Sequence, residues 1–156
     1  HASSSAASDV YKRQIYTIDT FERVQAKDLP CLENNRVQWA KLDSTSENCN
    51  SHFKNQGIKF DIIIDDGLHT PEGQRLTFER LFEFLKPTGS YYIEDVWMLD
   101  KVDRNHHWIT SHPNDFTMDK YNKLISVISE QEVTHHNFSS KAVPDSYILK
   151  IKWKHS

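Results

Sequence analysis

The sequence predicts an α/β fold with a mostly parallel β-sheet, and three observations support this prediction. Residues 62–64 form a short β-branched run without polar alternation, which is typical of a strand buried on both faces between helices. Strand-like segments alternate with segments of helical periodicity along the chain. Two of the expected strands end in pairs of acidic residues, Asp65-Asp66 and Glu94-Asp95, and open α/β sheets bind ligands at the carboxyl ends of their strands.

The composition of the 156-residue chain fits one domain and argues against several classes of partner. With 19 Lys and Arg against 22 Asp and Glu, the net charge of −3 gives no basic field to attract nucleic acid or anionic lipid. The mean hydropathy of −0.69 and the lack of a long apolar run argue against a membrane span. Cys31 and Cys49 are too few for a disulfide framework and no secretory leader is visible, so we expect a cytoplasmic protein.

The first 14 residues do not look like part of a domain. They are small and polar, then basic, without periodicity, and DVYKRQ resembles the translation of a transposon-end adapter used in sequencing libraries. We therefore interpret residues 1–14 as a non-native or disordered leader and residues 15–156 as a partial domain.

The elements expected before the central run are short. Asp19 ends the first expected strand, where an acid can accept hydrogen bonds from the ribose of a nucleotide, although it can equally be an ordinary surface residue. The other expected elements are a short helix within residues 21–32 that stops near Pro30, a strand over 37–42, a loop with helix-capping residues over 43–46, and a helix over 47–56 closed by Gly57.

The elements expected after the central run alternate in the same way. A long connection over residues 96–114 contains Trp97 and Trp108, which we interpret either as a lid over a ligand or as packing residues. The regular elements are an amphipathic helix from Pro71 through Leu85 with Thr70 as its cap, a break at 86–89, a strand over 90–95, a helix over 117–130, and strands over 132–138 and 147–153.

The acidic residues after residue 64 predict the active-site corner. A charge at the end of a buried strand needs compensation by hydrogen bonds, a metal or a ligand. Asp65 and Asp66 are followed by Gly67, which allows a sharp turn, and by His69. Oxygen ligands without cysteine favour Mg²⁺ over Zn²⁺. The alternatives are that the acids only form the turn and cap, that Glu94 and Asp95 are a solvated strand end, and that His69 is structural.

This order of strands and acids resembles the class I S-adenosylmethionine-dependent methyltransferases over residues 15–153. More narrowly, it is similar to the metal-dependent group that includes macrolide-sugar O-methyltransferases, in which DDGSH and a following IED recur. Here the motifs read DDGLH and IED, and KPTG stands where that group often has KPGG.

The resemblance implies a Rossmann-like methyltransferase sheet, S-adenosylmethionine as cofactor, and O-methylation of a small hydroxylated acceptor such as a sugar. It implies that Asp66 and His69 are catalytic, with His69 as general base. The implied cofactor-binding residues are Asp19, Asp43 and Asp65, and the implied Mg²⁺ ligands are Asp66, Glu94 and Asp95. The alternatives are a metal-independent methyltransferase, in which His69 and Asp66 only position the acceptor, and a non-catalytic Rossmann-like binding domain.

The resemblance also implies that part of the fold is missing. The sheet order of that family is 3-2-1-4-5-7-6, and a GxGxG loop follows its first strand, whereas this sequence has no glycine before Gly57. We therefore expect a fragment without the central strand, in which the strands at Ile15 and Ile62 have unpaired edges or residues 10–14 extend the first. Such a chain is expected to be poorly stable and, alone, to bind S-adenosylmethionine weakly or not at all.

Overall fold

The computed structural model describes residues 14–139 and 144–154, and it has the predicted α/β fold with a mixed sheet. The chain divides into two compact units, His1–Asp43 and Ser44–Ser156, and each unit contains one hydrogen-bonded sheet. No helix in the described ranges is long and apolar enough to cross a membrane.

The first unit is a pair of parallel strands, β1 (Ile15–Asp19) and β2 (Val37–Lys41). The α-helix predicted between them is wrong, because the described segment forms two 3₁₀ turns, η1 (Ala26–Asp28) and η2 (Pro30–Glu33). Leu29, which precedes Pro30, has an extended backbone with φ −113° and ψ 90°. A proline disfavours the helical region for the residue before it, so a helix cannot continue through this point.

The second unit is a four-stranded sheet with helices packed on it, in the strand order β3-β4-β6-β5. β3 and β4 are parallel, and β6 runs antiparallel to both β4 and β5. Its elements are α2 (Glu47–Gln56), β3 (Phe60–Asp65), α3 (Pro71–Leu81), η3 (Phe82–Phe84), β4 (Leu85–Val96), α4 (His107–Ser111), α5 (Met118–Ser129), β5 (Glu132–Asn137) and β6 (Tyr147–Lys152).

Capping residues set several helix boundaries, and the sequence predicts them for both ends of α2 and for the start of α3. The side chain of Ser46 accepts a hydrogen bond from the backbone of Cys49 at the start of α2, and Gly57 closes this helix with φ 64°. Thr70 and Thr117 cap α3 and α5 in the same way. Each cap satisfies a backbone N–H that has no partner within its helix.

The predicted end of α3 is wrong, because the helix stops at Leu81 and β4 already begins at Leu85. The pairing of β3 with β4 shifts here, between Phe60 opposite Leu85 and Ile62 opposite Ser90. Gly89 lies where a Cβ atom would stand 2.8 Å from the backbone oxygen of Asp61. The glycine therefore allows the irregular start of β4 to approach β3 closely.

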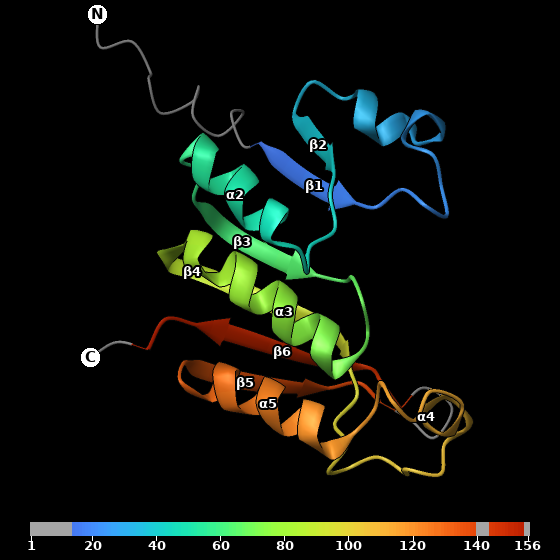
Figure 1. Ribbon diagram of the computed structural model, residues 1–156. Coiled ribbons are helices and arrows are strands. Elements are labelled where there is room, and N and C mark those ends of the chain that lie inside the picture. The colour runs from blue at the N-terminus through green and yellow to red at the C-terminus, as the bar shows by residue number, and fades with distance from the viewer. Residues whose placement is uncertain (1–13, 140–143, 155–156) are drawn as a thin grey trace, which may run out of the picture. The chain divides into compact units, whose positions relative to one another are not determined.

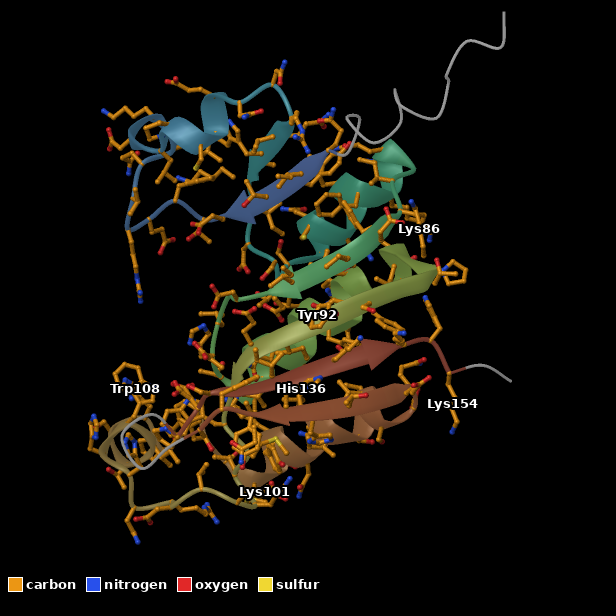
Figure 2. The ribbon with its side chains drawn as sticks, turned by 180° about the vertical axis from the view of Figure 1, so that it is seen from behind. Lys86, Tyr92, Lys101, Trp108, His136 and Lys154 are labelled. Atoms are coloured by element: carbon orange, nitrogen blue, oxygen red, sulfur yellow. The ribbon has the colours of Figure 1, made fainter. Side chains whose placement is uncertain are left out.

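All three long helices of the second unit, α2, α3 and α5, lie on one face of its sheet (Figure 1). The opposite face, which carries Tyr92 and His136, is seen from the front in Figure 2. Ile62 and Ile64 point to this second face and are 60% and 61% exposed, so the prediction that both faces of β3 are buried is wrong for the described residues. The buried core lies on the helical side and includes Tyr91, Ile93, Leu124, Leu149 and Ile151.

The strand orders β2-β1 and β3-β4-β6-β5 correspond to the segments 3-2 and 4-5-7-6 of the order that the resemblance implies. Among the described strands, none pairs with both β1 and β3. The expected extension of the first strand over residues 10–14 falls mostly outside the described residues, and Gln14 is described but is not in a strand.

Candidate functional site

The acidic ends of β3 and β4 meet in the second unit, at the carboxyl edge of its two parallel strands. Asp66 Oδ1 lies 3.2 Å from His69 Nε2, and His69 Nδ1 lies 3.6 Å from Asp95 Oδ2. One potential ligand atom of each of these three residues lies within 4.8 Å of the others. The imidazole therefore stands between two carboxylates that come from neighbouring strands.

A β-bulge at the end of β4 gives Asp95 its orientation. In the pairing with β6, Ile93 lies opposite Leu149 and Val96 lies opposite Tyr147, so β4 has one residue more than its partner. Asp95 occupies the left-handed region with φ 50°. Bulges break the alternation of side chains along a strand and redirect them, and they are frequent next to active sites. No sequence signal indicates this bulge, because the left-handed residue is not a glycine.

Asp65 is the buried member of the acidic pair on β3. Burial raises the pKa of its carboxyl to about 7, although the Gly67 backbone N–H, the charge of His69 and the Tyr91 hydroxyl each act to lower it. Asp65 Oδ1 accepts a hydrogen bond from Gly67 N at 3.3 Å. The buried Tyr91 hydroxyl lies nearby, and burial and the charge of Asp65 raise the pKa of this hydroxyl. The Asp65 side chain is therefore buried next to the cluster, bonded to the turn at Gly67, and does not face solvent.

The residues predicted to bind a cation or react are only partly brought together. Asp66, His69 and Asp95 form one group, whose side chains are 63%, 36% and 40% exposed and so open to a ligand. Two carboxylates beside an imidazole fit a hard divalent cation such as Mg²⁺. The Glu94 carboxylate is not in this group. Glu94 instead contributes its backbone oxygen to the corner, where it accepts a hydrogen bond from Gln74.

Gln74 is a residue of this corner that sequence reasoning missed. It belongs to α3, is 2% exposed, and donates from Nε2 to the backbone oxygens of Glu94 and Asp95. A sequence signal was present: Gln74 lies four and seven residues before Phe78 and Leu81, on the buried face of an amphipathic helix. A polar residue at a core position usually has a specific partner.

The residues predicted to hold the nucleoside part of a cofactor lie in the first unit. Asp19 Oδ1 accepts a hydrogen bond from the backbone of Phe21, and the Asp19 carbonyl accepts one from Leu42 N at 3.0 Å. Phe21 has φ 51° and packs edge-on against Trp39, so the chain turns sharply just after β1. The cofactor-binding roles of Asp19, Asp43 and Asp65 remain predictions.

The two tryptophans of the long connection after β4, which we interpret from the sequence either as a lid or as packing residues, differ in their surroundings. Trp97 is 3% exposed and packs on Phe116 and His106, which makes it a packing residue. Trp108 lies on α4, is 48% exposed, and stacks on His112 with ring centroids 4.7 Å apart. Figures 1 and 2 both place α4 at the end of the sheet where β3 finishes.

Comparison with solved structures defines the class of fold. The chain matches MycE methyltransferase in complex with Mg and SAH with a TM-score of 0.56 and 21% identity, over 89% of this chain and 36% of that one. It matches the O-methyltransferase from Bacillus cereus in complex with SAH with a TM-score of 0.58 and 15% identity, over 89% and 62% of the two chains. The fold is therefore that of the class I S-adenosylmethionine-dependent methyltransferases.

Sequence comparison points to a narrower group within that class. The chain is 34% identical over 83 residues to demethylmacrocin O-methyltransferase of Streptomyces fradiae, and 31% identical over 84 residues to mycinamicin VI 2''-O-methyltransferase of Micromonospora griseorubida. These matches cover 53% and 54% of this chain but 20% of each relative, so the match spans only about a fifth of their length. No family model matches the chain. In sequence, the chain is similar to macrolide O-methyltransferases.

Proposed function

We propose that this chain carries the cation and base corner of an S-adenosylmethionine-dependent O-methyltransferase that acts on a small hydroxylated acceptor such as a sugar. The observation that carries the proposal is the convergence of Asp66, His69 and Asp95 within 4.8 Å at the ends of two parallel strands. Names of the relatives support the acceptor class, since two are macrolide methyltransferases and a third is named for O-methylation of a rhamnosyl group.

In this proposal Asp66 and Asp95 hold Mg²⁺, with Glu94 as the further predicted ligand, and His69 is the general base. S-adenosylmethionine supplies a methyl group activated by its sulfonium, and Mg²⁺ lowers the pKa of a hydroxyl bound to it. His69 is the group that accepts the acceptor's proton, as general base. The carboxylates 3.2 and 3.6 Å from its nitrogens orient the ring and stabilise the imidazolium that forms.

Asp19 and Asp43 are proposed to bind the ribose and the adenine region of the cofactor. A GxGxG loop would lie against the methionine end, where backbone must approach closely, and this sequence has no such motif. We therefore expect calorimetry to detect weak or no binding of S-adenosylmethionine by this chain alone. Tight binding would show that the cofactor site is complete without that loop. A cytoplasmic location is proposed as well, since two cysteines are too few for a disulfide framework.

The experiment that tests the function is methyl transfer by the complete gene product to a panel of hydroxylated sugars, with and without EDTA. Activity that is lost on chelation and restored by Mg²⁺ supports the proposal, whereas activity that survives chelation favours the metal-independent alternative. His69→Ala is expected to lower kcat about 10²- to 10⁴-fold. The matched control is His136→Ala, since His136 is an exposed histidine on β5. No methyl transfer to any acceptor would favour a binding domain.

A further inference from the structure

We propose that Gln74 is a positioning residue that holds the bulge at Glu94 and Asp95 and so keeps the Asp95 carboxylate beside His69. Its inferred role in cation binding rests on the function proposed above, and its role in holding the bulge does not. Gln74 touches neither carboxylate of the cluster through its side chain, and acts through the backbone of β4.

The contacts of Gln74 are directed at the point where β4 becomes irregular. Its Nε2 lies 3.0 Å from the oxygen of Glu94 and 3.4 Å from the oxygen of Asp95. The two carbonyls fix which way round the amide lies, because the opposite orientation would set Oε1 against two oxygens. Oε1 has no hydrogen-bond partner in the described part of the chain. The amide group of Gln74 therefore uses its donors for the backbone oxygens of the bulge, although its own acceptor gains no hydrogen bond from the described residues.

The bulge needs such support for two reasons. The extra residue in β4 interrupts the ladder with β6, which leaves backbone groups to be satisfied by something other than a strand. Asp95 also occupies the left-handed region with φ 50°, which costs a non-glycine residue energy unless its surroundings hold it there. A pair of donors from a buried side chain meets both needs at once.

Helix α3 thereby links the two halves of the cluster. At its first turn, Thr70 caps Gly73, and a Cβ atom on Gly73 would lie only 2.5 Å from Cβ of Leu68. The helix start is therefore packed tightly against the loop that carries His69. The next residue of the helix, Gln74, holds the backbone of Asp95. Because one rigid element fixes both sides, the distance of 3.6 Å between His69 Nδ1 and Asp95 Oδ2 is set by α3.

The test uses Gln74→Met, which keeps length and volume but removes the donors, and Gln74→Glu, which keeps a polar isostere without the NH₂ group. Thr77→Val is the matched control, because Thr77 is also 2% exposed on α3 and its hydroxyl bonds to Ser44 instead. Mn²⁺ binding is measured by electron paramagnetic resonance, and the metal-free backbone by NMR. The two Gln74 variants are expected to bind Mn²⁺ about 10- to 100-fold more weakly than the wild type. Outside helix α3, their largest amide and Cα shift changes are expected at residues 94–96.

Thr77→Val is expected to retain wild-type Mn²⁺ affinity and wild-type shifts at residues 94–96. Wild-type Mn²⁺ affinity and unchanged shifts in both Gln74 variants would overturn the inference, as would an equal loss of affinity in Thr77→Val. If the wild-type chain binds no Mn²⁺, the cation site of the proposed function fails. The metal-free shifts then decide by themselves whether Gln74 holds the bulge.

Discussion

Asp65→Asn should remove a pH-dependent loss of stability that the buried carboxyl imposes on the fold. Asp65 is 5% exposed, and burial raises its pKa from 3.8 to about 7. Between these two pH values the folded chain keeps a proton that the unfolded chain has released. The free energy of unfolding contributed by this group is therefore highest below about pH 4, falls as the pH rises to about 7, and is constant above.

The size of this effect follows from the pKa difference. One pKa unit corresponds to about 1.4 kcal/mol, so a rise from 3.8 to about 7 corresponds to about 4 kcal/mol. Asn cannot ionise, and its Oδ1 can still accept the hydrogen bond that Asp65 receives from Gly67. We therefore expect Asp65→Asn to have about wild-type stability near pH 4 and to exceed the wild type by up to about 4 kcal/mol at pH 8.

Urea unfolding followed by tryptophan fluorescence measures this difference, in EDTA and across pH 4 to 8. Asp103→Asn is the matched control, because Asp103 is exposed and its Oδ1 accepts from the backbone two residues later, as Asp65 does. The difference between the control and the wild type should not change with pH beyond about 0.5 kcal/mol. If the difference for Asp65→Asn is equally flat from pH 4 to 8, the carboxyl is not held neutral by burial and the reasoning is refuted.

Two further predictions concern packing. Leu124 on α5 is 0% exposed, so Leu124→Ala should lower the free energy of unfolding by about 2–5 kcal/mol in a urea titration, and a loss below about 1 kcal/mol would contradict a close-packed core. Gly73→Ala should displace the loop that carries His69, because the new Cβ would lie 2.5 Å from Cβ of Leu68. The expected result is weaker Mn²⁺ binding and NMR shift changes at residues 67–69, whereas Gly57→Ala, which strains a distant helix end, should leave both unchanged.

The parts of the fold that local chemistry determines were predictable from the sequence. The cap at Thr70 and the glycine end of α2 are signals of a few residues each, and the structure has them as expected. The meeting of Asp66 with Asp95 was also predictable. Parallel strands end at the same edge, so acids that follow two of them converge.

Features that depend on distant parts of the chain were not predictable in the same way. Phe82 and Leu85 continue the helical spacing of α3, yet they belong to η3 and β4. The apolar pattern alone could not place the end of the helix, because a buried strand also begins with apolar residues. Ile62 and Ile64 form the expected apolar run, but their exposure depends on what lies over that face. The left-handed backbone of Asp95 has no local signal, and only its partner Gln74 was visible as a polar residue on a buried face.

The central claim is that Asp66 and Asp95 hold a divalent cation beside His69. Titration of the wild-type chain with Mn²⁺, followed by electron paramagnetic resonance, tests it most directly. Asp66→Asn and Asp95→Asn are the variants, and Asn suits the left-handed backbone at position 95. We predict saturable binding by the wild type and by Asp103→Asn, and binding at least about tenfold weaker in the two variants. Equal affinity in all four proteins, or no saturable binding by the wild type, would contradict the claim.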